Sequence, residues 1–186
     1  VFEVIEDLTD NVEMPVSVTI ASGFPKGDKL ELVTQKATEL GAQAIWAFPA
    51  DWSVVKWDGK KLAKKEDKLA KIGLGAAEQS KRNRVPEVRL FEKKGEFLSE
   101  LDNFDKIFIA YEETAKAGEL ATLARELAQV ESGQKILFIF GPEGGISPSE
   151  IDAFEEAGGL KIGLGPRIMR TETAPLYALS SVSYAL

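Results

Sequence analysis

The chain has 186 residues, of which 44% are hydrophobic and 28% are charged, and its net charge is −7. This composition and length are ordinary for one globular α/β domain with at most a small appendage. The sequence contains no Cys and no His, which excludes disulfides, Cys-His pairs and Ser-His-Asp triads and gives no reason to expect a metal site. No apolar run reaches the length of a membrane span, and the absence of Cys fits a cytoplasmic protein.

The N-terminal segment has the pattern of short β-strands. VFEVIE opens the chain, and PVSVTIA follows with strict alternation of Val16, Val18 and Ile20, which is typical of strands. Because this segment is too short for a domain and begins without Met, we expect residues 1–22 to be the remnant of a longer β domain, or else a β extension. The Gly and Pro residues at 23–27 predict a linker after it.

From residue 28 onward, helix and strand patterns alternate along the chain. Leu30, Val33, Ala37 and Leu40 share one helix face, and Gly41 is placed to end this helix. Such alternation is typical of βαβ units and predicts an α/β fold with a mostly parallel sheet. Further strands are expected at 44–50, 88–91, 106–111, 136–140 and 160–164, and further helices at 60–82 (with a break near Gly73 and Gly75), 117–129, 149–157 and 173–186.

The charge is distributed unevenly along the chain. Residues 54–94 hold 13 Lys and Arg against 6 Asp and Glu, although the whole chain carries −7. A basic stretch in an acidic protein is typical of a surface that binds a polyanion. A solvated Lys-rich helix explains the same pattern, and charge alone does not separate the two. Six lysines would supply sequence-independent attraction to phosphates: Lys60, Lys61, Lys64, Lys65, Lys68 and Lys71.

The stretch FIFGPEGGISPSE (138–150) combines three structural signals. The apolar run ILFIF predicts a buried strand, and Ser147, Pro148 and Glu150 predict a helix start with a capping box. A strand, a glycine turn and a helix N-terminus in succession point backbone N–H groups at a ligand outside the carboxyl end of a sheet. A tight turn that needs glycine for its backbone angles is the alternative.

Three of the expected strands, KIFIAY, ILFIF and LKIGL, run into loops with polar or glycine residues. If these strands are neighbours, their ends meet in one crevice. The GPEGG turn lacks the pattern of a Rossmann or P-loop phosphate site, and the carboxylate of Glu143 would repel phosphate. A ligand with a sulfonium centre, such as S-adenosylmethionine, fits better, and a nucleotide-phosphate binder is the alternative.

Four segments, in this order, are similar to motifs of the RsmE family: QKATELG (35–41), AAEQSKRNRVPEV (76–88), FGPEGGISPSE (140–150) and LGPRIMRTETA (164–174). Members of this family are SPOUT-superfamily enzymes that methylate ring nitrogen 3 of a uridine in 16S ribosomal RNA of the small subunit, with S-adenosylmethionine as the methyl donor. The resemblance implies a SPOUT domain at 26–186 with a C-terminal trefoil knot. It also implies a homodimer and a PUA-like RNA-binding domain, of which residues 1–22 would be the remnant.

The resemblance also implies a cofactor site, because three loops of the SPOUT fold wrap the cofactor. Here those loops follow KIFIAY, ILFIF and LKIGL. The glycines of the GPEGG turn would let the backbone approach the cofactor. The adenine pocket would be formed by Leu164, Gly165, Ile168 and Met169, although core packing explains Ile168 and Met169 equally well. The implied cofactor-binding residues are Ala110, Tyr111, Phe140, Gly141, Pro142, Glu143, Gly144, Gly145, Leu164, Gly165, Ile168, Met169, Arg170, Thr173 and Ala174.

Methylation of a uracil ring nitrogen requires that the imide lose its proton and that negative charge on the carbonyl oxygens be stabilised. Arg170 is the candidate for stabilising this charge, and an ion pair with Glu143 or Glu172 is its alternative role. Glu172 is the candidate base, with Glu143 or a water as alternatives. Thr171 or Thr173 is expected to cap the last helix.

Gln79 and Arg82 lie three residues apart on the expected basic helix, and hence on one face. Together with Arg84 they are the candidate RNA-binding residues. Two other functions remain open at this point. One is a SPOUT methyltransferase for transfer RNA or a ribose 2′-hydroxyl, and the other is a catalytically silent RNA-binding module.

Overall fold

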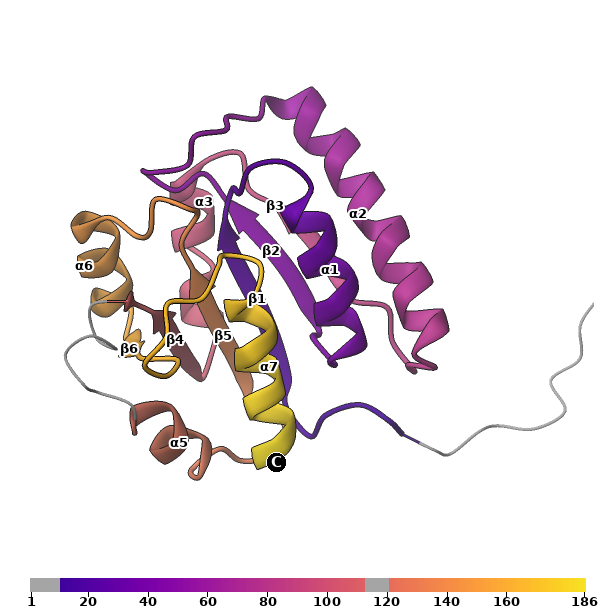
Figure 1. Ribbon diagram of the computed structural model, residues 1–186, viewed down its shortest axis with the longest axis vertical. Coiled ribbons are helices and arrows are strands. Elements are labelled where there is room, and N and C mark those ends of the chain that lie inside the picture. The colour runs from indigo at the N-terminus through magenta and orange to yellow at the C-terminus, as the bar shows by residue number, and fades with distance from the viewer. Residues whose placement is uncertain (1–10, 113–120) are drawn as a thin grey trace, which may run out of the picture.

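The computed structural model describes residues 11–112 and 121–186, and these residues form an α/β fold around a parallel sheet (Figure 1). The sheet has six strands in the order β3-β2-β1-β5-β4-β6, and every pairing is parallel. The strands are β1 (Ser17–Gly23), β2 (Ala44–Phe48), β3 (Glu87–Leu90), β4 (Lys106–Ala110), β5 (Lys135–Phe140) and β6 (Leu160–Ile162). The predicted mostly parallel α/β sheet is therefore confirmed.

Helices cover both faces of the sheet (Figure 1). The first face carries α1 (Lys29–Glu39), α2 (Gly59–Gln79), α5 (Thr122–Leu127) and α7 (Ala174–Ala185). The other face carries α3 (Lys94–Leu98), the short 3₁₀ helix η1 (Leu101–Asn103) and α6 (Pro148–Glu156). This arrangement explains why the central strands are apolar on both sides, as the run ILFIF predicted.

Alternation along β5 divides the core into two clusters. Ile136 and Phe138 pack with the helices of the first face, whereas Leu137 and Ile139 pack with α3 and α6. Successive side chains of a strand point to opposite faces, so one strand contributes to both clusters. Because β5 pairs with β1 on one side and β4 on the other, it connects the two halves of the sheet.

Local helix signals in the sequence are confirmed where they depend on neighbouring residues. The Ser147 hydroxyl accepts a hydrogen bond from the N–H of Glu150 (3.2 Å), the Glu150 carboxylate accepts from the N–H of Ser147 (3.1 Å), and Pro148 begins α6. Gly41 ends α1 with a φ of 93°, a conformation that favours glycine. Thr173 occupies the N-cap position of α7, but its side chain makes no capping hydrogen bond.

The expected break in the basic helix does not occur, and α2 runs without interruption from Gly59 to Gln79. Gly73 instead allows close packing, because a Cβ built there would lie 3.3 Å from Cγ of Pro86. Two short helices, α3 and η1, were not predicted because each spans less than two turns. Residues 113–120, within which the predicted helix 117–129 begins, lie outside the described residues.

The assignment of residues 17–22 to a remnant β domain is wrong. These residues form β1, which lies in the centre of the sheet between β2 and β5. The strand itself was correctly predicted, but a local pattern does not identify the strand's partners. Gly23 closes β1 rather than opening a linker. Residues 1–10 lie outside the described residues. No described helix is long and apolar enough to cross a membrane.

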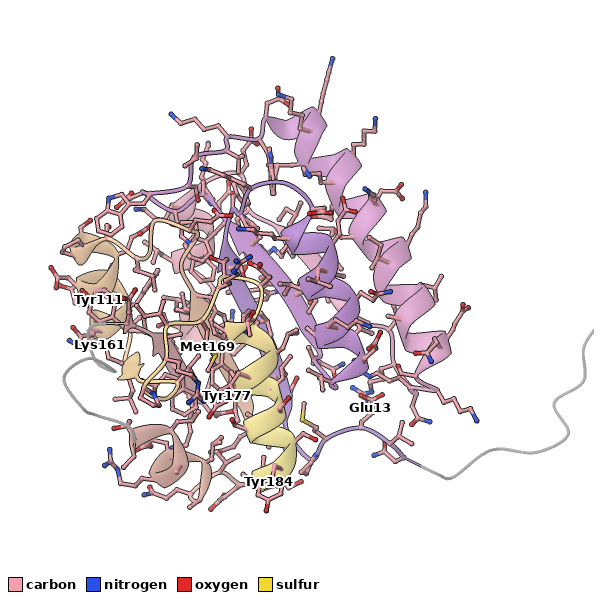
Figure 2. The ribbon with its side chains drawn as sticks, viewed as in Figure 1. Glu13, Tyr111, Lys161, Met169, Tyr177 and Tyr184 are labelled. Atoms are coloured by element: carbon pink, nitrogen blue, oxygen red, sulfur yellow. The ribbon has the colours of Figure 1, made fainter. Side chains whose placement is uncertain are left out.

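Arg82, predicted to contact RNA, is a buried structural residue. Its side chain is 3% exposed and forms an ion pair with Glu13, which lies near the C-terminal ends of α1 and α2 (Figure 2). Its guanidinium also donates hydrogen bonds to the carbonyls of Thr38 (3.1 Å) and Ala42 (2.6 Å). Burial raises the pKa of Glu13, but the hydrogen bond and charge of Arg82 outweigh it and lower that pKa. The prediction for Arg82 is therefore wrong in this structure.

Replacing Arg82 should destabilise the fold without a direct effect on any ligand. Arg82→Met removes the ion-pair partner of Glu13 and the guanidinium donor of two carbonyls, and removing one partner of a buried pair costs about 3 kcal/mol. Arg84→Met is the matched control, because Arg84 is exposed and such changes stay within about 0.5 kcal/mol. Urea unfolding followed by circular dichroism measures both, and equal stability of the two variants would contradict this role.

Candidate active site

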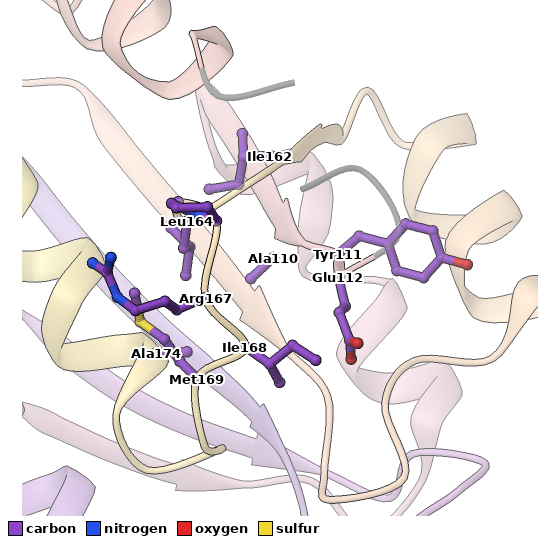
Figure 3. A pocket seen from close by; sticks show the side chains of 11 residues that line it. Ala110, Tyr111, Glu112, Ile162, Leu164, Arg167, Ile168, Met169 and Ala174 are labelled. Carbon is purple, nitrogen blue, oxygen red and sulfur yellow. The ribbon is translucent and has the colours of Figure 1, made fainter. Parts of the chain in front are cut away.

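Two adjoining cavities lie at the carboxyl ends of the central strands. The smaller, of about 130 Å³, is formed by residues that follow β4 and β6 and by the start of α7 (Figure 3). The larger, of about 610 Å³, is formed mainly by the GPEGG turn after β5 and by residues 168–171. The two share Ala110, Tyr111, Glu112, Ile168, Met169 and Ala174. The expected convergence of three strand ends is therefore confirmed.

The GPEGG turn folds tightly because its glycines leave no room for side chains. A Cβ built on Gly141 would lie 2.6 Å from the carbonyl carbon of Gly145, and Gly145 has a φ of 85°. A Cβ on Gly23, at the end of β1, would lie 2.5 Å from Cδ of Pro142. The turn thus lies against the end of β1, where the connections of the sheet change direction. Such switch points are where parallel α/β sheets bind ligands.

The smaller cavity has mostly apolar walls. Ile162 and Leu164 contribute from β6 and the loop after it, and Ile168 and Met169 from the segment that leads to α7. Figure 3 shows the Tyr111 ring directed away from Ile168 and Met169, and this ring packs instead against the cluster beneath α6. Its backbone N–H donates to the Ile162 carbonyl (3.2 Å), so Tyr111 joins the β4 and β6 ends. A flat apolar group fits these walls.

Charged side chains of both signs gather at the larger cavity. Glu143 accepts hydrogen bonds from Nζ of Lys29 (2.6 Å) and from the N–H of Lys26 (3.0 Å). Burial raises the pKa of Glu143, but these hydrogen bonds outweigh it and lower that pKa, whereas the Glu143 hydrogen bond raises the pKa of Lys29. Nζ of Lys29 is also 3.7 Å from the Glu172 carboxylate.

Arg170 is exposed at the larger cavity. The ion pair with Glu143 or Glu172 that was its alternative role is absent among residues 11–112 and 121–186, because Lys29 pairs with both carboxylates. Its carbonyl accepts the N–H groups of Thr173 (2.8 Å) and Ala174 (3.0 Å), which fixes its backbone at the start of α7. The guanidinium is therefore available to a ligand in this cavity.

A second polar cluster fastens the loop after β2 to the beginning of α6. The N–H of Asp51 donates to the Glu150 carboxylate (2.9 Å), and the Ser147 hydroxyl donates to the Asp51 carboxylate (2.6 Å). Glu150 is only 2% exposed. Lys94 pairs with both acids. The Lys94 and Ser147 hydrogen bonds lower the pKa of Asp51. This cluster therefore connects the loop after β2, the beginning of α3 and the beginning of α6, which closely follows the GPEGG turn.

Most of the predicted cofactor-binding residues line one of the two cavities. Thr173 lines neither, and nor does the catalytic candidate Glu172. Gln79 lies elsewhere, in a groove between α1 and α2, and Arg84 is exposed beyond the end of α2. Of the described residues, no group of three or more acidic side chains is placed to hold a metal ion.

Sequence reasoning missed several residues that line these cavities. Lys29 and Trp52 line the larger cavity, while Pro166 and Arg167 line the smaller. Trp52 follows the expected strand 44–50, so the rule that ligands bind beyond strand ends would have singled it out. Lys29 begins a helix, and no local pattern marks it as a partner of Glu143.

The chain matches the model of a family described as RNA methyltransferase domain over residues 12–183. It is 50% identical over 181 residues to ribosomal RNA small subunit methyltransferase E of Bacillus subtilis (strain 168), a match that spans 97% of this chain and 71% of that protein. The chain belongs to the RNA methyltransferase family, as the resemblance to RsmE proteins predicted.

Solved structures of two methyltransferases share the fold. A putative methyltransferase from Legionella pneumophila, in complex with bound cofactor SAM, aligns with a TM-score of 0.83 and 33% identity over 96% of this chain and 70% of that one. Ribosomal RNA small subunit methyltransferase E from Neisseria gonorrhoeae, bound to S-adenosyl methionine, aligns with a TM-score of 0.74 and 30% identity over 96% and 69%. The family membership therefore rests on both sequence and fold.

Replacing Lys29 should change the titration of Glu143. Because Lys29 is the main group that lowers this pKa against burial, Lys29→Met should raise the pKa of Glu143. In the wild type, the ion pair stabilises the fold above the unfolded-state pKa, and this stabilisation is lost as pH falls through the lowered folded-state pKa. The stability of Lys29→Met should not fall in this way as the pH is lowered.

Nuclear magnetic resonance of ¹³C-labelled Glu carboxyls measures the Glu143 titration directly. Lys26→Met is the matched control, because Lys26 contributes its backbone N–H and not its side chain to Glu143. An unchanged Glu143 titration in Lys29→Met would show that the ion pair does not form in solution.

Proposed function

We propose that this protein transfers a methyl group from S-adenosylmethionine to ring nitrogen 3 of a uridine in 16S ribosomal RNA of the small subunit. The observation that carries the proposal is that the two motifs FGPEGG and LGPRIMR form a single pair of adjoining cavities. These motifs belong to a chain 50% identical to a protein named ribosomal RNA small subunit methyltransferase E. The two relatives that hold the methyl donor have the same fold.

The residues of the two cavities fit S-adenosylmethionine. The apolar walls of the smaller cavity, which include Leu164 and Ile168, suit a flat adenine. Gly141 and Gly145 line the larger cavity, and their lack of side chains lets a ligand approach the backbone there. The Glu143 carboxylate at the adjoining cavity is compatible with a sulfonium charge and unfavourable for phosphate.

When bound, S-adenosylmethionine supplies an electrophilic methyl group, which leaves its sulfur as a bond to uracil nitrogen forms. The chain's own task is to hold the uracil in line and to manage its charge, and correct positioning accounts for much of the acceleration of such a transfer. Arg170, whose guanidinium has no ion pair among the described residues, is positioned to stabilise negative charge on a uracil carbonyl oxygen. A rigid backbone at the start of α7 supports this role.

The imide proton needs an acceptor, and Glu172 is the proposed base. Glu143 is less suitable, because two hydrogen bonds occupy its carboxylate and lower its pKa, which weakens a general base. By contrast, one Glu172 oxygen is buried and has no hydrogen-bond partner within the described part of the chain. The same oxygen is 3.7 Å from Nζ of Lys29, which lines the larger cavity, although Glu172 itself does not line it.

The RNA partner is proposed to contact the basic surface of α2. Lys60, Lys61 and Lys64 are exposed there, while Lys68 and Lys71 pair with acidic neighbours. Gln79 and Arg84 remain proposed RNA contacts at the C-terminal end of this helix. Phosphate contacts of this kind predict binding that weakens as salt concentration rises.

Two further features are proposed from the RsmE resemblance: a C-terminal trefoil knot and a homodimer. The exposed side chains of α7 support the dimer. Tyr177 and Tyr184 are both exposed on this helix (Figure 2), and exposed aromatic residues on one helix are typical of an interface. Sedimentation velocity tests it, and a monomer at micromolar concentration would argue against it. A ribosomal RNA substrate implies a cytoplasmic location.

The proposed function is tested by incubating the protein with S-adenosylmethionine and small ribosomal subunits that lack its modification. Digestion to nucleosides and mass spectrometry should show one 3-methyluridine per 16S RNA. A methyl group on a ribose hydroxyl, or modification of transfer RNA only, would replace this proposal with another methyltransferase activity. Calorimetry that shows no binding of S-adenosylhomocysteine would favour a catalytically silent RNA-binding protein.

Replacing Arg170 should slow the methyl transfer more than it weakens substrate binding. Arg170→Met removes a charge that acts mainly in the transition state, and kcat should fall about 10²-fold. Arg170→Lys, which retains charge but not the planar donor geometry, should recover part of this loss. Steady-state kinetics with small subunits would detect the difference. An unchanged kcat with a raised KM would instead assign Arg170 to binding.

Replacing the proposed base should change the pH dependence of the reaction. Glu172→Gln should lower kcat at neutral pH about 10²-fold, which is typical of a lost general base. Its rate should then rise with pH, because solvent hydroxide removes the imide proton in its place. Glu143→Gln is the comparison variant, and the roles of the two acids are reversed if it alone shows this pH dependence.

A further inference from the structure

Trp52 is an exposed aromatic residue at the larger cavity. It is 47% exposed, whereas Trp46 is 6% exposed and packs between Phe91 and Phe104. The third tryptophan, Trp57, is half-buried and packs against Phe24, with 4.3 Å between the ring centroids and an angle of 32° between the ring planes. Trp52 therefore contributes less to the core than the other two, although exposure of so large an apolar ring is unfavourable. Because Trp52 lines the larger cavity, we expect a bound ligand to cover its ring.

The indole lies directly against the glycine turn. A Cβ built on Gly144 would lie 2.9 Å from Cβ of Trp52, and one built on Gly145 would lie 3.8 Å from the ring atoms Cε3 and Cζ3. Any side chain at position 144 would therefore displace Trp52. The glycines at 144 and 145 therefore not only form the turn but also leave room for an aromatic ring beside the proposed site of the methyl donor.

The loop that carries Trp52 is fastened on both sides of the ring. Asp51 is bound to Glu150, Ser147 and Lys94, and the N–H of Ser53 donates to the carbonyl of Ala50 (3.0 Å). Glu150 and Ser147 belong to the capping box that begins α6, directly after the GPEGG turn. The same cluster therefore holds the tryptophan and the turn in one fixed relation, which is the requirement for a preorganised binding surface.

Two cations and a flat ring meet at this cavity. Lys29 and Arg170 line the larger cavity together with Trp52. An unpaired pyrimidine has a π face that stacks on aromatic side chains and carbonyl oxygens that accept hydrogen bonds from cations. A base that reacts at a ring nitrogen must leave its pairing before the reaction. The combination of an exposed ring and nearby donors matches these two needs.

We propose that Trp52 is the surface on which the substrate uracil stacks during methyl transfer. This inference rests on the proposed function and names a substrate-binding residue for the same site. Trp52 would orient the flat ring, while Arg170 contacts its carbonyl edge. The adenine of the donor would lie in the smaller cavity, whose lining does not include Trp52.

Kinetics with small ribosomal subunits and S-adenosylmethionine test this role. Trp52→Ala should raise KM for the subunits about tenfold to a hundredfold, since stacking on an aromatic side chain contributes that much per base. Its affinity for S-adenosylhomocysteine and its melting temperature should stay close to wild type. Trp52→Phe, which keeps an aromatic face, should recover most of the loss. Val54→Ala, in the same loop and exposed, is the matched control.

A binding measurement gives a readout that does not depend on catalysis. Hexauridylate, added to protein saturated with S-adenosylhomocysteine, should quench the tryptophan fluorescence of the wild type. Trp52→Phe should bind the oligonucleotide but lose this quenching, because Trp46 and Trp57 lie away from the cavity lining.

Several results would overturn the proposal for Trp52. An unchanged KM in Trp52→Ala, with active wild-type protein, would refute it and leave the proposed function intact. A loss of S-adenosylhomocysteine affinity equal to the loss for RNA would assign the ring to the donor instead. A wild-type protein that neither binds S-adenosylhomocysteine nor transfers a methyl group would overturn both proposals.

Discussion

The close approach of two backbone segments without side chains organises the whole site. Gly23 ends β1, Pro142 lies against it, and Gly141 packs on Gly145 at distances that no Cβ could tolerate. Because β1 and β5 are adjacent in the sheet, this contact places the GPEGG turn over the point where the chain connections change direction. The larger cavity, which the turn lines, depends on that position, and so does the ring of Trp52.

Charge pairs then fix the walls around the turn. Lys29 joins the beginning of α1 to Glu143, and Lys94 joins the beginning of α3 to Asp51 and Glu150. Both clusters are partly buried, where an ion pair is screened less than at the surface. Arg170 lines the larger cavity, and its guanidinium forms no ion pair with any described residue. In a protein with no His and no Cys, charges of this kind are the main means of controlling reactivity.

The charged residues are distributed unevenly over the molecule, and the net charge does not show this. A total of −7 argues against RNA binding, yet the exposed lysines of α2 form a basic surface on one side of the molecule. Arg82 shows that a position within a basic stretch does not by itself place a side chain on the basic surface. It lies between exposed Lys81 and Arg84, but its guanidinium turns inward to Glu13 and to two carbonyls. Buried and exposed cations therefore alternate along a few residues.

The sequence by itself determined the features that arise from near neighbours along the chain. The capping box at Ser147, the glycine end of α1 and the apolar strand ILFIF follow from spacing and residue type, and so does the parallel α/β class. The motif resemblance located most of the cavity lining, because those loops are continuous in sequence. Only the tertiary structure decided that residues 17–22 belong to the central sheet and that Arg82 is buried. It also decided that Lys29 meets Glu143, 114 residues away, and that Trp52 lies on the glycine turn. These contacts depend on strand order, and strand order results from the packing of the whole chain rather than from any local pattern.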